Sequence, residues 1–501
     1  MSEIDTRVIT FAEPAWTLPP AEVRETHTGV VVLCGDRAYK VKKPVVTDFL
    51  DFGTTAARER ACARELELNR RLAPDVYLGL AHLTDPTGGA GEPVLVMRRM
   101  PEQLRLATVV ADPACGYAEI VTLATMLAEF HRTATRSPRI NSEGRVEALR
   151  GRWDLVLAGL REHTATAVRM RTLVRRYLAG RARLFDARIA QRRIVDGHGD
   201  LLTDDIFGPA DDIRILDCLD FDDSLRYVDG LDDAAFLAMD LEFHGREDLA
   251  ATFLTEYLAA AADHPPTSLC EHYLGYRAAV RAKVIGIRAA QGDPTAPARA
   301  RGHLDLAVRH LERGAVRLVL VGGLPGTGKS TLACMLARQS GATVLATDTV
   351  RQELVRAGKI DGPAGILDSG RYAPAAVTAV YATLRKRAET LLRQGHSVIL
   401  DASWSDPTER RRARALAVDT YADLHEFRCV VDPDIAQRRL RLRGRTDSEV
   451  TPSIAADIAD RAAPWPQAQV LDTACPQTDT ADTALRWAWP HLDASPAGRQ
   501  P

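Results

Sequence analysis

A strand-like run that leads directly into a glycine-rich turn most constrains how this 501-residue chain can fold. Residues 316–331 read VRLVLVGGLPGTGKST, so an apolar run meets the pattern GxxxxGK[ST] and then an apolar-periodic helix. In this pattern the glycines let backbone N–H groups approach phosphate, the lysine neutralises charge, and the hydroxyl at the helix start is a Mg²⁺ ligand. A chance glycine turn is the alternative, but the flanking strand and helix argue against it.

The turn predicts a nucleotide site in a parallel sheet. The residues expected to contact the nucleotide are Gly323, Leu324, Pro325, Gly326, Thr327, Gly328, Lys329, Ser330 and Thr331. Lys329 is expected at the β and γ phosphates and Ser330 on Mg²⁺. Further β-type runs lie at 343–346, 397–400 and 425–431, separated by helix-type sequence. Such alternation predicts a parallel sheet with helices on both faces.

Two of these runs are followed by or end in an acid that would lie near the phosphates. Asp348, with Arg351 close behind it, follows the run at 343–346, and ligands of such sheets bind at the carboxyl ends of the strands. Asp348 is expected either as the general base for an acceptor hydroxyl or as the N-cap of the next helix, and one residue can do both. Asp401 ends the next run and is expected to hold the metal through water.

An arginine cluster follows the last of these runs. It consists of Arg438, Arg439, Arg441, Arg443 and Arg445. Arg439 and Arg443 share a helix face at i,i+4. A solvated basic helix and a lid that brings arginine to a transferring phosphoryl group both explain the cluster. With the glycine-rich turn, residues 316–470 resemble the small P-loop kinases grouped with polynucleotide kinase, zeta toxin and gluconate- or shikimate-type kinases.

Overall composition excludes several function classes. The 65 Lys and Arg against 67 Asp and Glu give a net charge of −2, which does not indicate a nucleic-acid partner. No apolar run approaches the roughly 18 residues of a membrane helix, and residues 1–16 lack a signal-type apolar core, so we expect a cytoplasmic protein without a membrane partner. The eight cysteines form no CxxC pair and are expected to be reduced thiols.

The domain boundary is expected near Gly314. A helix-type segment ends there, and a Pro/Gly/Ala-rich stretch lies at 291–302. We therefore expect one domain over 1–314 and a second, the P-loop domain, over 315–501. The sequence does not indicate an oligomeric state.

A second acidic site is expected in the first domain. Residues 194–223 read IVDGHGDLLTDDIFGPADDIRILDCLDFDD, in which strand-type runs lead to Asp200 and Asp217 with Asp205 between them. These carboxylates would converge on a metal-bound nucleotide, whereas the alternative is an ordinary acidic turn region.

The HGD segment resembles the aminoglycoside phosphotransferase and choline kinase family, which has a two-lobed protein-kinase-like fold. The resemblance implies that Asp200 is the catalytic base and that Asp217 binds Mg²⁺. Asp205 stands where the family has asparagine, so this chain keeps an oxygen ligand and adds negative charge. Upstream, the resemblance favours Lys40 for the phosphates, with Lys42 as the alternative. It implies Glu65 as the partner of that lysine, and the alternative is that Glu65 belongs to an exposed helix rich in Glu and Arg pairs.

Several blocks together resemble a branch of this family whose members often carry a fused P-loop kinase-like domain. The blocks are THTGVVVLCGDRAYKVKKPV, ELELNRRLAPDVYLGL, HGDLL and YRAAVRAKV. The last block predicts a basic helix that carries Tyr276, Arg277, Arg281 and Lys283. It is expected to be a surface helix, and the alternative is a docking site for an anionic or phosphorylated acceptor. The resemblance implies a bifunctional phosphotransferase that uses ATP and Mg²⁺ on small hydroxyl-bearing metabolites. A degenerate first domain that regulates an active P-loop kinase is the alternative.

Overall fold

The computed structural model of the chain describes residues 21–25, 29–46, 51–84, 91–160, 165–290, 292–363, 368–442 and 458–492. The chain divides into two compact units, one of residues 1–119 with 200–223 and the other of residues 120–199 with 224–501. No helix within the described ranges is long and apolar enough to cross a membrane.

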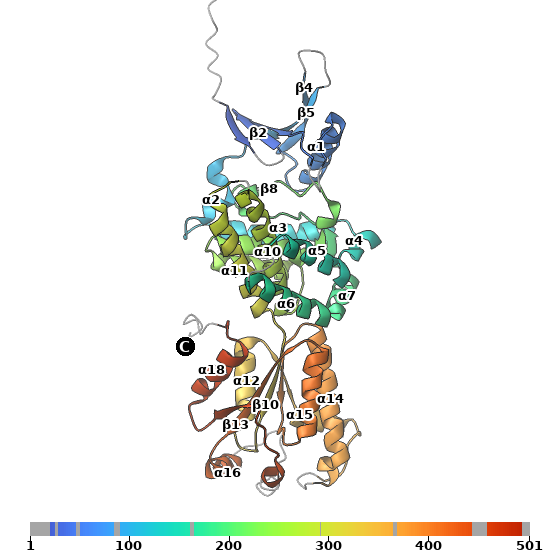
Figure 1. Ribbon diagram of the computed structural model, residues 1–501, viewed down its shortest axis with the longest axis vertical. Coiled ribbons are helices and arrows are strands. Elements are labelled where there is room, and N and C mark those ends of the chain that lie inside the picture. Colours follow the sequence, from blue (N-terminus) through green and yellow to red (C-terminus); the bar gives the residue numbers. More distant parts are fainter. Residues whose placement is uncertain are drawn as a thin grey trace, which may run out of the picture. The chain divides into compact units, whose positions relative to one another are not determined.

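An antiparallel sheet forms the core of the first unit (Figure 1). Its strands, in spatial order, are β1 (Glu22–Glu25), β2 (Gly29–Cys34), β3 (Arg37–Lys42), β5 (Glu92–Arg98) and β4 (Tyr77–Leu83). The predicted hairpin of β2 and β3 turns at Gly35, whose φ of 57° is easily adopted by glycine. In β3, Lys40 and Lys42 lie on the same face, since strand side chains alternate.

One helix, α1 (Thr55–Asn69), packs on β4 and β5. It begins where the Thr54 hydroxyl accepts a hydrogen bond from Ala57 N–H at 3.1 Å. Its buried face includes Glu65, 1% exposed, which is a charged residue that needs partners there.

A short hairpin completes the first unit. It follows the turn Thr203–Asp205 and pairs β7 (Ile206–Phe207) with β8 (Arg214–Ile215). Phe207 and Leu216 join a cluster of buried side chains from the sheet and from the loop after α1, which includes Val76, Tyr77 and Leu95. This packing places Asp217, two residues after the end of β8, beside β3.

The second unit begins with a helical region. Its helices are α3 (Tyr117–Thr133), α4 (Pro138–Ser142), α5 (Val146–Ala158), α6 (Ala165–Gly180), α7 (Ala182–Ala190), α8 (Gly230–Phe243), α9 (Glu247–Ala260), α10 (Thr267–Ala290) and α11 (Ala296–Arg313), and the strands β6 (Ile194–Asp196) and β9 (Tyr227–Asp229) pair beside them. Helix α8 is almost wholly buried. The expected surface position of Arg277 on α10 is wrong, because its side chain is buried.

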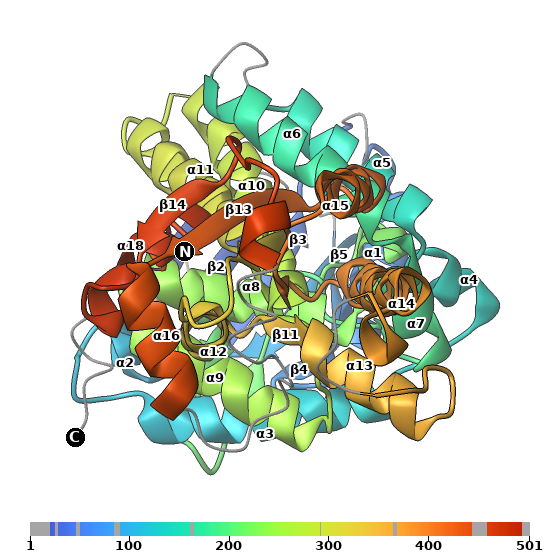
Figure 2. The ribbon, with the colours of Figure 1, turned by 90° about the horizontal axis from the view of Figure 1, so that it is seen from below.

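The last part of the second unit is a five-stranded parallel sheet. Its strands in spatial order are β11 (Thr343–Ala346), β12 (Val398–Asp401), β10 (Arg317–Gly322), β13 (Asp423–Val430) and β14 (Gln469–Asp472). The helices around it are α12 (Lys329–Ser340), α13 (Thr347–Arg356), α14 (Pro374–Arg393), α15 (Pro407–Asp419), α16 (Pro433–Leu442) and α18 (Gln477–Ala488). Helices α12 and α18 cover one face of the sheet and α14 and α15 the other (Figures 1 and 2).

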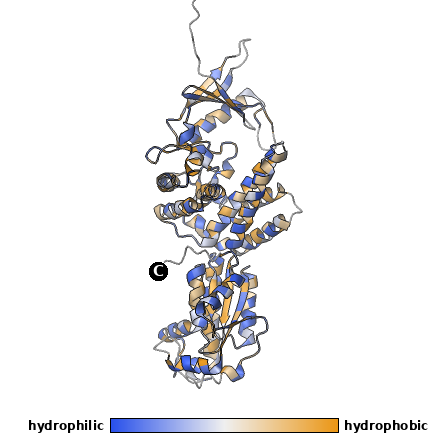
Figure 3. Ribbon diagram, turned by 90° about the vertical axis from the view of Figure 1, so that its left-hand side faces the viewer, coloured by the Kyte–Doolittle hydropathy of each residue, from blue (hydrophilic) through white to orange (hydrophobic). Residues whose placement is uncertain are grey.

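The strand order places the central strand β10 between two neighbours, and every residue of it is buried. The strands of this sheet are mainly hydrophobic, whereas the helices around it carry both hydrophobic and hydrophilic residues (Figure 3). The predicted fold class, a kinase-like first part and a P-loop sheet covered on both faces, is confirmed. The boundary expected at Gly314 falls between α11 and β10, inside the second unit, and stays a prediction.

A buried histidine links three helices of the second unit. His310 of α11 lies with Nε2 2.9 Å from Glu242 of α8 and with Nδ1 2.7 Å from Glu271 of α10. Burial alone would lower the pKa of this imidazole, but the two carboxylates outweigh it and raise the pKa from 6.5 to about 9. Because the folded-state pKa is raised, the added stability is complete below about pH 6.5 and is lost as pH rises through about 9.

We therefore predict that the apparent Tm of the full chain falls as pH rises from about 6.5 to 9. Up to about 3 kcal/mol of the free energy of unfolding is lost over this range. His310→Gln should flatten this slope, whereas His264→Gln, at an exposed position, should leave it unchanged. Calorimetric scans across this pH range check the prediction, and an identical slope in the His310→Gln variant would contradict it.

Candidate functional sites

The glycine-rich turn has the backbone that phosphate binding needs. Gly323, Gly326 and Gly328 have φ values of 145°, 81° and 82°, and α12 begins directly after them at Lys329. A Cβ on Gly323 would lie 2.6 Å from both the Cys429 carbonyl oxygen and the Thr327 hydroxyl. Only glycine fits at that position. The turn leads directly into the start of α12, and the N–H groups of a helix start can bind an anion.

Two cavities meet at the start of α12. The first, about 450 Å³, is lined by the glycine-rich turn, by Arg439 and by Thr473. The second, about 510 Å³, is lined by Asp348 and Asp401. Lys329 and Ser330 line both cavities.

Asp348 lies in the first turn of α13, where the N-cap residue is Ala346. The helix-cap alternative for Asp348 is therefore wrong. Its carboxylate in the first turn still interacts favourably with the helix dipole. Its Oδ1 accepts a hydrogen bond from Arg351 at 2.6 Å, and the Arg351 guanidinium lies 4.4 Å above the Tyr372 ring. Arg351 therefore holds the Asp348 carboxylate at the wall of the second cavity.

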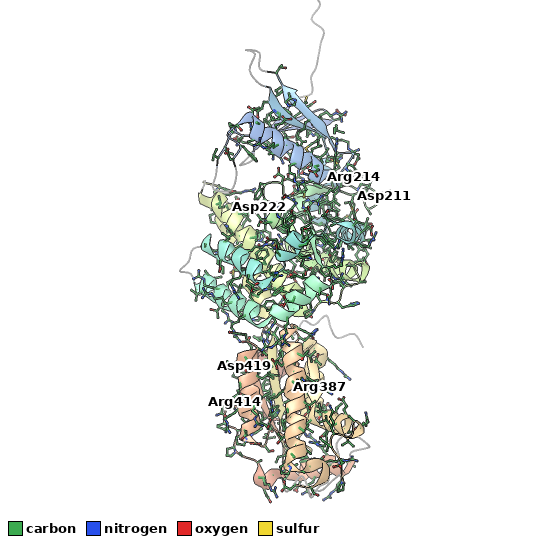
Figure 4. The ribbon with its side chains drawn as sticks, turned by 90° about the vertical axis from the view of Figure 1, so that its right-hand side faces the viewer. Asp211, Arg214, Asp222, Arg387, Arg414 and Asp419 are labelled. Atoms are coloured by element: carbon green, nitrogen blue, oxygen red, sulfur yellow. The ribbon has the colours of Figure 1, made fainter. Side chains whose placement is uncertain are left out.

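Asp401 is buried at the end of β12 and lines the same cavity. Arg387 of α14, labelled in Figure 4, also lines this cavity. Its guanidinium lies 2.5 Å from the Glu353 carboxylate of α13. The sequence analysis did not single out Arg387 or Glu353, because their proximity depends on how α13 packs against α14.

Of the predicted lid arginines, Arg439 lies at the glycine-rich turn, and Arg443 lies outside the described residues. The Arg439 guanidinium donates to the Thr473 carbonyl at 2.7 Å and to its hydroxyl at 3.3 Å. The Thr473 hydroxyl in turn donates to the Thr327 carbonyl at 2.7 Å. Thr473, which sequence reasoning missed, thus joins the arginine to the turn.

In the first unit, a cleft of about 590 Å³ lies beside the predicted kinase-like residues. Its apolar walls include Val31 and Ala38 of the sheet and Phe207 and Leu216 of the hairpin segment. Its polar lining includes Lys40, Asp204, Asp205 and Asp217. An apolar slot beside a lysine and several carboxylates suits a base attached to metal-bound phosphates.

Lys40 makes the predicted pair with Glu65. Its Nζ lies 2.7 Å from Glu65 Oε1 and 2.7 Å from Asp217 Oδ1. Burial disfavours the charged lysine, but Asp217 and Glu65 outweigh it and raise the pKa of Lys40 well above its usual range. Burial likewise disfavours the charged form of Glu65, but Lys40 and Lys42 lower its pKa. Between the two candidate lysines, Lys40 is the one that lines the cleft.

Asp217 has a left-handed backbone, with φ of 58°, which is uncommon outside glycine. Two side chains support it there. Its N–H donates to the Tyr77 hydroxyl at 3.1 Å, and the next N–H, of Cys218, donates to Asn69 Oδ1 at 2.8 Å. Sequence reasoning missed Tyr77 and Asn69, since neither belongs to the motif that indicates the site.

The segment before Asp200 is anchored within the second unit. Asp233 of α8 accepts from the N–H groups of His198 at 2.7 Å and Gly199 at 2.8 Å. Arg277 pairs with Asp232 at 2.7 Å and donates to the Gly199 carbonyl at 3.2 Å. Arg277 thus supports the predicted catalytic loop from within the protein instead of presenting charge to an acceptor.

The carboxylates of the first unit have the chemistry of a Mg²⁺ site. Burial first, and then the charges of Asp217, Asp200 and Asp204, raise the pKa of Asp205 well above its usual range. A cation would relieve this repulsion, and oxygen ligands suit Mg²⁺. Within the described ranges no three His, Cys, Asp or Glu side chains form a ready-made metal centre. Two carboxylates completed by nucleotide phosphates are the usual arrangement for Mg²⁺.

The fold and these sites define a chain with a kinase-like first part and a P-loop domain. Residues 318–464 match the family model described as AAA domain, which confirms the P-loop assignment. The proteins Rv2004c of Mycobacterium tuberculosis and Mb2027c of Mycobacterium bovis are 50% identical to this chain over 472 residues, which is 93% of this chain and 95% of each relative. The chain belongs to the family of these mycobacterial proteins.

Solved structures of two kinases are also similar to parts of the chain. A sugar kinase from Janibacter sp. HTCC2649 shows 20% identity over 36% of this chain and 97% of its own, with a TM-score of 0.28. A choline/ethanolamine kinase family protein from Mesorhizobium loti shows 16% identity over 60% of this chain and 90% of its own, with a TM-score of 0.39.

The tight approach at Gly323 gives a prediction. Gly323→Ala should abolish ATP binding at the glycine-rich turn, because its Cβ would collide with backbone and side-chain oxygens. Gly341→Ala is the matched control, since Gly341 also has a positive φ, 69°, but a Cβ there meets nothing within 4 Å. The control should lose about 1–2 kcal/mol of stability and keep ATP binding. Calorimetric titration with ATP, together with thermal unfolding, compares the two variants, and equal ATP affinities would contradict the prediction.

Proposed function

We propose that this protein is a bifunctional ATP-dependent phosphotransferase in which each half phosphorylates a hydroxyl group of a small metabolite. The observation that carries the proposal is the pair of cavities that share Lys329 and Ser330. A nucleotide in the first cavity would present its γ-phosphate to an acceptor in the second. Hydrolysis of ATP alone would not need a second cavity of this size.

In the P-loop half, Lys329 and the N–H groups at the start of α12 would hold the β and γ phosphates. Asp348, oriented by Arg351, would accept the proton of the acceptor hydroxyl as its oxygen attacks the γ phosphorus. The bond from that phosphorus to the ADP oxygen would break, and Arg439 would neutralise charge on the transferring group. Mg²⁺, for which Ser330 and Asp401 offer oxygen ligands, would neutralise charge on the phosphates when bound.

In the kinase-like half, Asp200 would be the base and Lys40, held by Glu65, would contact the phosphates. Asp205 and Asp217 would hold Mg²⁺. The 590 Å³ cleft with an apolar slot supports the roles of Lys40, Asp205 and Asp217, which line it, whereas Asp200 is not among its lining residues. One observation favours the regulatory alternative. Lys40 already forms ion pairs with Glu65 and Asp217, and a nucleotide would have to displace one of these contacts to reach the lysine.

The number of nucleotides bound per chain tests both sites together. The full chain should bind two Mg-ATP, and Lys329→Ala and Asp217→Asn should each bind one. Combining the two changes should abolish binding, whereas Lys359→Ala, at an exposed position outside both cavities, should bind two. Isothermal titration calorimetry gives these numbers. One Mg-ATP on the parent and none on Lys329→Ala would remove the N-terminal activity and favour the regulatory alternative.

Turnover at the P-loop half should depend on Asp348. Asp348→Asn should lower phosphorylation by about 10²- to 10⁴-fold with little change in ATP affinity, since only proton transfer is removed. Asp419→Asn, an exposed position on α15 (Figure 4), is the control and should behave as the parent. Mass spectrometry of a metabolite panel incubated with Mg-ATP and the full chain measures the products in an Asp200→Asn background. Unchanged product formation by Asp348→Asn would rule out its role as the base.

A further inference from the structure

A second lysine lies behind Lys40 and has no access to the cleft. Lys42 is 6% exposed, and its Nζ lies 5.1 Å from the centre of the Phe52 ring. It lies 2.8 Å from Glu65 Oε2, the carboxylate oxygen that Lys40 does not contact, and 2.7 Å from Asp220 Oδ2. Glu65 therefore has one lysine on each oxygen.

Asp220 connects this buried lysine to the metal-binding segment. It follows Asp217 by three residues, so Lys40 and Lys42 of one strand hold two points of one short segment. Burial disfavours the charged form of Lys42, but Glu65 and Asp220 outweigh it and raise its pKa, so Lys42 stays charged at neutral pH. A buried ion pair of this kind is costly to break from one side, because the remaining charge is left without its partner.

The two lysines respond differently when a nucleotide enters. Lys40 lines the cleft together with Asp217, so phosphates would draw Lys40 away from Asp217. Lys42 and Asp220 are not among the residues that line the cleft, so their contact would persist. The persistent contact would keep Asp217 close to β3 after Lys40 has released it.

We propose that Lys42 and Asp220 are positioning residues that hold the 217–220 segment against β3 and so keep Asp217 ready for Mg²⁺. Lys42 also engages the second oxygen of Glu65, which leaves Glu65 a single oxygen with which to hold Lys40. This inference rests on the proposed nucleotide site of the kinase-like half. It assigns the second lysine a role that is separate from phosphate contact.

The test uses the full chain with Lys329→Ala, so that ATP binds only in the kinase-like half. In this parent, Lys42→Met should weaken Mg-ATP binding by about 10- to 100-fold, the usual cost of losing a residue that orients a metal ligand. Binding of ATP without Mg²⁺ should change by less than about threefold, because Lys40 remains. A purely structural role would weaken both equally. Calorimetry with and without Mg²⁺ measures the difference.

Asp220→Asn should reproduce this Mg²⁺-specific loss, and the double variant should lose no more than either single change if the two residues act as one contact. Lys43→Met is the control, since Lys43 pairs with Glu25 instead of Glu65, and should bind as the parent. Should Lys42→Met fail to fold by thermal unfolding, Asp220→Asn, which keeps the side-chain shape, decides the question.

Three outcomes separate this inference from the proposed function. If the Lys329→Ala parent binds no Mg-ATP, the nucleotide site itself is absent and both proposals fall. If the parent binds but the Lys42 and Asp220 variants keep its Mg-ATP affinity, only the positioning role is overturned. Equal losses with and without Mg²⁺ overturn it as well.

Discussion

A carboxylate buried between two lysines organises the first unit. Glu65 on α1 is 1% exposed, and its Oε1 accepts a hydrogen bond from Lys40. Its Oε2 lies 2.8 Å from the Lys42 Nζ. An uncompensated charge at this depth would be strongly destabilising, so the helix, the strand and the segment after β8 have to be in place together. Lys40, one of the two lysines that balance Glu65, also lines the cleft, so the stability of this unit and the proposed nucleotide binding share that residue.

The P-loop site depends on backbone shape more than on charge balance. Positive φ values at three glycines let the chain turn directly into α12, and the N–H groups and dipole at a helix start favour an anion. Thr473 and Arg439 line the cavity at this turn, and Asp348 and Asp401 line the neighbouring cavity that shares Lys329 and Ser330. The buried strand β10 supports the arrangement, because it cannot shift without disturbing both of its neighbours.

The helical part of the second unit anchors the residues that precede Asp200. Helix α8 is buried on nearly all sides, and its Asp233 fixes the two peptide N–H groups that precede Asp200. Burial would raise the pKa of Asp233, but His131, with further help from His198 and Arg277, holds it well below its usual range. The carboxylate is therefore ionised at neutral pH and remains a strong acceptor for those N–H groups.

The sequence by itself determined the P-loop, the parallel sheet and the acids Asp348 and Asp401 at its carboxyl edge, because glycine-rich turns and strand periodicity are local patterns. It also indicated Lys40, Glu65, Asp200 and Asp217 through a resemblance of motifs. Only the tertiary structure placed Lys40 at the cleft and Lys42 in the interior, brought Asn69 and Tyr77 to the Asp217 backbone, and joined two cavities at Lys329. Those features depend on side chains that meet across as many as 178 residues of sequence, and such contacts follow from packing, which no local pattern records.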